Sequence, residues 1–387
     1  MKKVFMSFAA LVAAFAAVSC VDEDYGGNVN TDTAVEVKVE EEPVETTGND
    51  IIGVEATESV VIADEDGNTV EIPAVVSEET PEATATSEPV TISTFVPGEE
   101  IILKGSDIKV KVPISKDFPK DDVFSALTNP HFIIKVSNPL GVAFHYASTV
   151  HNPKWPDGTK DITIDADIPA IKGDVFVYVS ESGAVAPKAD AKRIDASKVN
   201  NFPQVFAGSP DELDIKDAKV EAISTETSSI QKAAAETVEF EFSAKSIFPL
   251  EVKGNAPFTI RKSFDISGVD LSSDEYKDMK KVAANVTLKH NIPFTMELAL
   301  VEPDPSVVTV VCPVIKAAPF KNANSNETEF IEQTGDVSAS SPKGPAAIGN
   351  KIVVDITAKL QGKSQFQISD DVKVSVKVNS YKLTVTL

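Results

Sequence analysis

Apolar and polar residues alternate along most of the chain after residue 90, in short runs separated by turn-forming residues. Successive side chains of a strand point to opposite faces, so a period of two predicts strands with one buried and one solvated face. The clearest runs predict antiparallel strands at Ile108–Val112, Phe132–Val136, Ile162–Ile164, Val175–Val179, Val238–Phe242, Val307–Val311, Ile352–Val354, Val372–Val378 and Leu383–Leu387.

Two stretches about 154 residues apart share one pattern: a short helix, a strand, an Asn and a Pro, then four alternating apolar residues. The first helix begins at Asp121–Asp122 and carries Val123, Phe124 and Leu127. The second begins with a capping box at Ser272 and Glu275 and carries Tyr276, Met279 and Val282. The alternating sets are Leu140, Val142, Phe144 and Tyr146, and Phe294, Met296, Leu298 and Leu300. The pattern indicates two related domains.

These signals predict an all-β fold of two tandem antiparallel β-sandwich domains with Ig-like architecture, each with one short helix. The predicted boundaries are 90–222 for the first sandwich and 236–387 for the second. Residues 223–235, which are rich in Ser, Thr and Ala, are the predicted linker.

The segment before the sandwiches, residues 20–89, differs sharply in composition. Residues 21–100 hold 22 acidic side chains and one basic side chain, Lys38, so most of the net charge of −23 lies there. Such a segment buries too little apolar surface to offset chain entropy, and we expect a disordered acidic tether. Within it, residues 58–73 predict a hairpin, whose turn lacks the spacing of an EF-hand calcium loop.

The first 19 residues have the pattern of an export signal. Lys2 and Lys3 precede an apolar run, Val4–Val18, that is short for a membrane span. Ala17–Cys20 then resembles the lipobox of bacterial lipoproteins, although Ala17 departs from the usual Leu. The resemblance implies cleavage before Cys20, lipid on its sulfur and an essentially permanent membrane anchor. An ordinary signal peptide with an incidental cysteine is the alternative.

The acidic cluster Asp22–Asp24 directly after Cys20 resembles the surface-export signal of Bacteroidota lipoproteins. The resemblance implies an outer-membrane protein that faces the outside of the cell; a tether facing the periplasm is the alternative. Asp32–Ala34 resembles the O-glycan acceptor motif of the same phylum, with Thr33 as the candidate acceptor.

Residues 101–387 are nearly neutral and carry no basic stripe, which argues against a nucleic-acid partner. The acidic tether argues against binding to an anionic membrane surface. The chain has two cysteines, so once Cys20 is lipidated, Cys312 has no partner for a disulfide. We interpret Cys312, at the end of the apolar run Val307–Cys312, as a buried strand residue.

No motif for nucleophilic catalysis, phosphate binding or a zinc helix occurs in the sequence, so we expect neither an enzyme nor a cofactor. His145 and His151 lack a Cys or a well-spaced carboxylate to complete a metal site. His145 is out of phase with Phe144 and should face away from the core. Asp161, Asp165 and Asp167 alternate along one strand and indicate a solvated face rather than a hydrolase centre.

The segment His151–Gly158 holds the only tryptophan, in a loop between two predicted strands. Sugars stack on exposed aromatic rings and bond to Asn, Asp and His, which makes Trp155, His151 and Asp157 candidate glycan contacts. A tryptophan that closes the end of a sandwich is the alternative. The low aromatic content argues against an extended glycan platform.

Together these observations favour a lipid-anchored cell-surface protein with a non-enzymatic binding or structural role. One alternative is a glycan-binding accessory lipoprotein of a sugar-uptake system, which would need exposed aromatics beside Trp155. The other is a pilus or adhesion subunit resembling fimbrillins. Fimbrillins generally carry a processing arginine near the N-terminus, whereas the first arginine here is Arg193.

Overall fold

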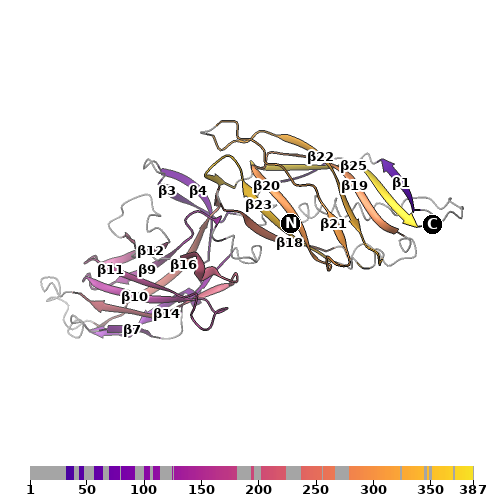
Figure 1. The fold of residues 1–387 in the computed structure, drawn as a ribbon. Coiled ribbons are helices and arrows are strands. Elements are labelled where there is room, and N and C mark those ends of the chain that lie inside the picture. The colour runs from indigo at the N-terminus through magenta and orange to yellow at the C-terminus, as the bar shows by residue number, and fades with distance from the viewer. Residues whose placement is uncertain are drawn as a thin grey trace. The chain divides into compact units, whose positions relative to one another are not determined.

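The fold comes from a computed structural model, drawn in Figure 1. It describes residues 32–38, 43–47, 56–63, 69–78, 80–91, 100–104, 108–113, 124, 126–180, 193–195, 202–223, 237–254, 256–265, 279–322, 325–343, 347, 351–368 and 371–386. The export signal, Cys20 and the predicted linker apart from Ile223 lie outside these described residues.

The chain forms two compact units rather than two successive segments. Unit 2 is residues 56–251, and unit 1 combines residues 1–55 with residues 252–387. The predicted all-β fold with antiparallel sheets is confirmed. The named helical elements of the described residues are two 3-10 turns, Pro81–Ala83 (η2) and Phe202–Phe206 (η3). No helix within those residues has the length and apolarity to cross a membrane.

The strands of unit 2 are β3 (Glu58–Ala63), β4 (Thr69–Val76), β5 (Thr84–Ser87), β6 (Val90–Thr91), β7 (Glu100–Lys104), β8 (Ile108–Lys111), β9 (His131–Asn138), β10 (Phe144–His151), β11 (Ile162–Ile168), β12 (Gly173–Ser180), β13 (Arg193–Asp195), β14 (Glu212–Ala222), β15 (Thr237–Val238) and β16 (Glu241–Pro249). β9 lies between β12 and β16, and β10 lies between β11 and β14. The pairing of β5 with β7 joins these two layers along one edge.

Unit 2 buries an aromatic core between its layers. Tyr146 of β10 stacks on Phe242 of β16 with ring centroids 6.0 Å apart. Phe206 of η3 stacks on Phe124 at 4.7 Å and meets Phe248 edge-on at 5.4 Å. These ring contacts fix η3 against the core of unit 2.

The strands of unit 1 are β1 (Asp32–Lys38), β2 (Val44–Thr47), β17 (Glu251–Lys253, whose first residue still belongs to unit 2), β18 (Phe258–Asp265), β19 (Met279–His290), β20 (Phe294–Glu302), β21 (Thr309–Val311), β22 (Ile331–Ser340), β23 (Lys351–Leu360), β24 (Gln365–Gln367) and β25 (Lys373–Thr386). One sheet has the order β1-β25-β19-β22-β21, with β2 also on β25; a second has the order β18-β23-β20. Their buried faces are mainly Val, Ile and Ala.

The N-terminal segment differs from the predicted tether. The β3–β4 hairpin is present, with Ala63 opposite Thr69. However, β1 and β2 pair with β25, and β3 to β6 belong to unit 2. The acidic composition hid these pairings because their partners, such as Leu383 opposite Val35, lie almost 350 residues away in sequence.

The predicted boundary between the sandwiches also differs. The run Val238–Phe242 was expected to open the second domain, but β16 pairs with β9, β4 and β5 of unit 2. Met279 and Val282, expected in a helix, lie in β19, where the ladders to β22 and β25 override the local helix signal. In the first copy, Phe124 and Ala126 are helical and buried.

The repeated Asn–Pro pattern marks the same event in both units. Asn138 and Pro139 connect β9 to β10, and Asn291 to Pro293 connect β19 to β20; in each pair the two strands lie in different layers or sheets. Both Asn side chains are buried and bond to backbone, Asn138 to Val142 O and Asn291 to Asp371 O. The repeat is therefore present at this crossing, while the later strands follow different orders.

Candidate functional site

The loop at residues 152–161, between β10 and β11, is a chain of tight turns. Trp155 N donates to Asn152 O at 2.9 Å, Gly158 N to Trp155 O at 3.0 Å, and Asp161 N to Gly158 O at 3.1 Å. Gly158 has a φ of +71°, a conformation that glycine adopts without the strain of a side chain. Its sequence, rich in Pro, Asp and Gly, suits such turns.

Asn152 fastens this loop to the body of unit 2. Its side chain is fully buried, and its Nδ2 donates to Val205 O and Ala207 O, both at 2.8 Å. Its Oδ1 accepts from Lys154 N at 2.9 Å. The Lys154 ammonium adds bonds to Gly208 O and Ser209 O, each 2.7 Å. The loop is thus held by η3 and the residues that follow it, and η3 is fixed by the phenylalanine contacts of Phe202 and Phe206.

Trp155 is partly exposed on this fastened loop. The residue is 37% exposed, and its indole Nε1 donates to Ala207 O at 3.1 Å. The Lys160 ammonium lies 5.3 Å from the ring centroid, in cation–π geometry. The arrangement shows a ring whose polar edge is bound to protein while part of its surface faces solvent.

The other two predicted contacts do not converge with Trp155. His151 is buried, and its Nδ1 lies 2.9 Å from Asp161 Oδ1, so it braces the base of the loop. Asp157 is exposed and accepts from Thr159 N at 3.2 Å and from Thr159 Oγ1 at 2.9 Å. These bonds lower the pKa of Asp157 below its ordinary value. The structure therefore presents Trp155 and Asp157 on the loop surface but not His151.

His145 faces away from the core, as predicted. Its Nδ1 lies 2.9 Å from Asp167 Oδ1 and its Nε2 lies 3.3 Å from Asp165 Oδ1, both on neighbouring β11. The carboxylates of Asp165 and Asp167 are exposed, which agrees with the predicted solvated face. Asp161 departs from that prediction, because it precedes β11 and is partly buried against His151. Among the described residues, no group of three or more His, Cys, Asp or Glu is arranged to hold a metal ion.

Thr33 and Cys312 fall in unit 1. Thr33 lies in β1, opposite Val385 of β25. Cys312 is partly buried and packs against the cluster of Ala284, Val286, Val337 and Val378. Burial raises the pKa of the Cys312 thiol to about 11, which makes it a poor nucleophile at neutral pH and fits a structural role.

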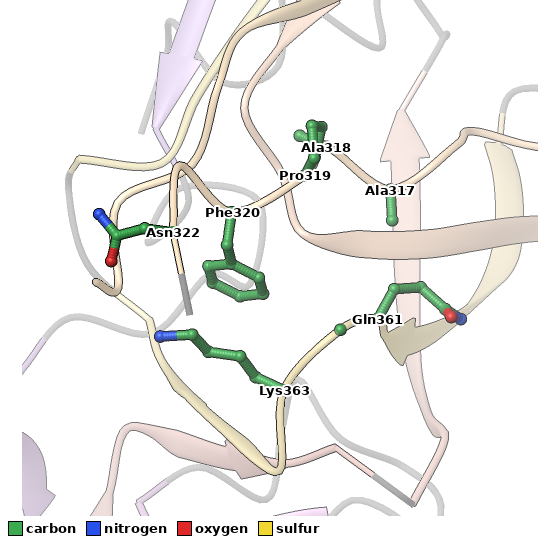
Figure 2. Close-up of a pocket in the computed structure, with 8 residues that line it drawn as sticks. Ala317, Ala318, Pro319, Phe320, Asn322, Gln361 and Lys363 are labelled. Carbon is green, nitrogen blue, oxygen red and sulfur yellow. The ribbon is translucent and has the colours of Figure 1, made fainter. Parts of the chain in front are cut away.

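A second candidate place is an open cavity of about 460 Å³ in unit 1 (Figure 2). Its lining residues are Ala317, Ala318, Pro319, Phe320, Asn322, Gln361, Gly362 and Lys363. The Lys363 ammonium lies 4.7 Å from the centroid of Phe320 and donates to Ser325 O and Asn326 Oδ1. The cavity falls in the size range of small-ligand sites.

Sequence reasoning missed this cavity because its two walls are 40 residues apart and each reads as an ordinary loop. The bond from Gln361 N to Pro293 O and the bond from Ala318 N to Ile292 O bring the walls together. Only the pairing of the strands could have revealed it. Its polar side chains show no convergence on one point that would identify a ligand.

No protein-family model matches the chain, and no curated protein matches it in sequence. Among solved structures, it is similar to a protein presumed to be secreted from Parabacteroides distasonis ATCC 8503, at 11% identity and a TM-score of 0.44, over 91% of this chain and 99% of that one. It is also similar to PfGH50B (8% identity, TM-score 0.20, 50% of this chain and 22% of that one). A third similarity is to a chain of Broad bean stain virus, at 7% identity and a TM-score of 0.18, over 80% of this chain and 90% of that one. These TM-scores are too low to support a functional assignment.

Proposed function

We propose that the chain is a lipid-anchored protein of the outer cell surface with a non-enzymatic binding or structural role. The observation that carries this proposal is the leader of residues 1–24, in which small residues precede Cys20 and an acidic cluster follows it. Lipid on Cys20 would hold two β-sandwich units at the membrane.

The described residues are consistent with a role that needs no chemistry. The buried Asn152 and Asn291 clamp backbone, and buried His151 is occupied by Asp161. The exposed His145 bonds to two solvated carboxylates. Each of these groups has a structural task, which supports a scaffold that displays surfaces.

Metabolic labelling with a palmitate analogue tests the anchor. We expect label on the wild-type protein and none on Cys20→Ala, because the acyl chains need the Cys20 sulfur. Protease treatment of intact cells then tests the side of the membrane, and loss of the full-length band indicates exposure on the outer surface. Unlabelled wild-type protein, or protection in intact cells with digestion after lysis, would contradict the respective part of the proposal.

A second candidate function, glycan binding, is favoured by the fixed presentation of Trp155. A ring held by Ala207 O and Asn152 loses little entropy when a ligand stacks on it, and pre-organisation of this kind favours affinity. Asp157 lies exposed on the same loop.

Affinity electrophoresis in gels containing soluble polysaccharides tests this candidate. We expect Trp155→Ala to lose retardation in the gel that retards the wild-type protein. Phe330→Ala is the matched control, since Phe330 is 52% exposed in unit 1 and its removal should leave retardation unchanged. Equal mobility of all three proteins in every polysaccharide gel would end the glycan hypothesis.

A further inference from the structure

The N-terminal segment follows nearly the whole length of the last strand. β1 runs antiparallel to β25 from the Asp32–Thr386 pair to the Lys38–Ser380 pair. β2 continues along the same strand from the Val44–Val376 pair to the Thr47–Lys373 pair. The pairing register along β25 differs by two residues between β1 and β2. β1 and β2 together therefore pair with both ends of β25, from Thr386 at one end to Lys373 at the other.

These pairings give unit 1 two distinguishable ends. At the Asp32 end lie the last residue of β25 and the first residues of β19 and β21, since Lys281 lies opposite both Thr384 and Ser340, and Ser340 lies opposite Thr309. β25 is 14 residues long, so the opposite end is about 45 Å away at 3.3–3.4 Å per residue.

Both chain connections to unit 2 leave from that opposite end, which we call the Thr47 end. Thr47, opposite Lys373, is the last paired residue before unit 2 begins at Ala56. The return connection enters through β17, which pairs with β24, and Gly254 N donates to Ser364 O. His290, the last residue of β19, lies at the same end, opposite Val374.

The length of chain between Cys20 and unit 1 is short. Residues 21–31 separate the candidate lipid-bearing cysteine from Asp32. Twelve Cα–Cα steps span at most about 40 Å even when fully extended. Composition predicted a tether of about 70 residues between Cys20 and the first sandwich. Because β1 pairs with β25 from Asp32 onward, only 11 residues separate Cys20 from unit 1.

We propose that unit 1 is a membrane-proximal spacer whose Asp32 end faces the lipid headgroups, and that unit 2 is attached at the end farther from the bilayer. This inference rests on the proposed lipidation of Cys20. The pairing of β1 and β2 with β25 makes the spacer possible. Without it, the chain from Cys20 would first join a folded unit at the unit boundary after residue 55. With it, the chain from Cys20 joins unit 1 at the Asp32 end. The Trp155 loop then belongs to the unit that is attached away from the membrane.

Energy transfer from labelled cysteines to an acceptor lipid in vesicles tests the spacer. The lipidated full-length protein carries Cys312→Ser and one of two label sites, Thr309→Cys at the Asp32 end or Gln361→Cys at the Thr47 end. Both residues are exposed, and Gln361 N bonds to Pro293 O directly after the end of β19. We expect transfer from position 309 to be about twofold or more above that from position 361, given the separation along the strands.

The double variant Val35→Pro/Glu36→Pro tests the role of β1. Successive strand N–H groups alternate between the partner and solvent, so two adjacent prolines remove at least one ladder bond. Release of β1 lengthens the chain between Cys20 and the first paired residue, which becomes Val44, to about 80 Å when extended. The ratio of energy transfer from position 309 to that from position 361 should then fall toward one. The control Asn28→Pro/Val29→Pro places the prolines in the leash and should keep the wild-type ratio.

The outcomes separate this inference from the anchoring itself. Wild-type protein that does not float with vesicles contradicts the proposed lipid anchor. Wild-type protein that floats but gives equal transfer from positions 309 and 361, or more from 361, overturns the spacer. A proline variant that floats and keeps the wild-type ratio overturns the part assigned to β1.

Discussion

The two units solve the same packing problem with different side chains. Among the described residues of unit 2, nine aromatic residues are fully buried: Phe124, Phe132, Phe144, Tyr146, Phe202, Phe206, Phe240, Phe242 and Phe248. In unit 1 the core consists of strand-borne Val, Ile and Ala, with Phe258, Phe294 and Phe366 in edge-on contacts. Unit 2 therefore adds a cluster of packed rings to its aliphatic strand residues, whereas the core of unit 1 depends mainly on aliphatic residues of paired strands.

The difference extends to how each unit depends on the chain. Unit 2 is one continuous stretch of sequence, 56–251. Unit 1 is formed from two stretches, because β1 and β2 pair with β25, and the entire sequence of unit 2 lies between them. Each unit also contains a side chain whose signal reports on its unfolding, the Trp155 ring in unit 2 and the partly buried thiol of Cys312 in unit 1. A chain that starts at Val21 lacks Cys20, so Cys312 is its only thiol. In that chain, Trp155 fluorescence follows the unfolding of unit 2, and the reactivity of Cys312 follows the unfolding of unit 1.

The largest expected effect comes from Phe206→Ala, which removes the ring that contacts Phe124, Phe132, Phe202 and Phe248. We expect unit 2 to lose about 3–5 kcal/mol of unfolding free energy, because a buried cavity replaces the ring. Urea unfolding followed by Trp155 fluorescence measures it. The midpoint for Cys312 reactivity should not move; an equal shift would show that the units unfold as one.

Acid should weaken unit 1 through His290. This histidine is fully buried at the end of β19, and burial lowers its pKa to about 4. The unfolded chain, with an ordinary pKa near 6.5, therefore binds a proton that the folded unit excludes. The contribution of neutral His290 to the unfolding free energy of unit 1 is fully present above pH 6.5 and is lost as pH falls toward 4. The total loss is about 3 kcal/mol.

Replacement of His290 by Gln isolates this effect from other acidic groups. The difference in unfolding free energy between wild type and His290→Gln should change between pH 7 and about pH 4.5 in favour of the variant. Cys312 reactivity with dithiodipyridine, which reacts in acid, follows unit 1. A difference that is the same at both pH values would contradict burial of a neutral His290.

Asn152→Ala tests the clamp on the Trp155 loop. The change removes the Asn152 donor from Val205 O and one of the two donors from Ala207 O, which keeps its bond from Trp155 Nε1, so we expect a loss of about 1–3 kcal/mol in unit 2. Trp155 fluorescence should also show greater solvent exposure before unfolding. Gln361→Ala, an exposed amide in unit 1, should cost less than about 0.5 kcal/mol. A similarly small cost for Asn152→Ala would mean that the loop is not clamped.

The smallest expected effects compare the exposed cation–π pairs of the two units. The Lys160 ammonium lies 5.3 Å from the Trp155 ring centroid, and the Lys289 ammonium lies 5.9 Å from that of Phe330. Lys160→Ala and Lys289→Ala should each cost about 0.5–1 kcal/mol or less, with the larger loss at Lys160 because tryptophan is the stronger partner. Urea titrations of each variant measure the two costs, and a larger loss at Lys289 would contradict the ranking.

The sequence by itself determined the local elements of this protein. Val175–Val179 lies in β12, and Val372–Val378 lies in β25 except for Val372, which directly precedes that strand. The sequence could predict both strands because a period of two is a property of each segment alone. The same rule placed His145 on the outer face and the hairpin at β3–β4. The loop that carries Trp155 was also predicted between two strands.

Only the tertiary structure decided which strands pair and which unit each belongs to. The alternating pattern of a strand does not indicate which other strand it pairs with. The sequence around Val35 therefore could not show that Val35 pairs with Leu383, and the sequence around Phe242 could not show that Phe242 pairs with Val136 of β9. The clamp of Asn152 and the pairing of His151 with Asp161 depend on these long-range choices in the same way. A strand's faces follow from its own residues, whereas its neighbours follow from the burial and hydrogen bonding of the whole chain.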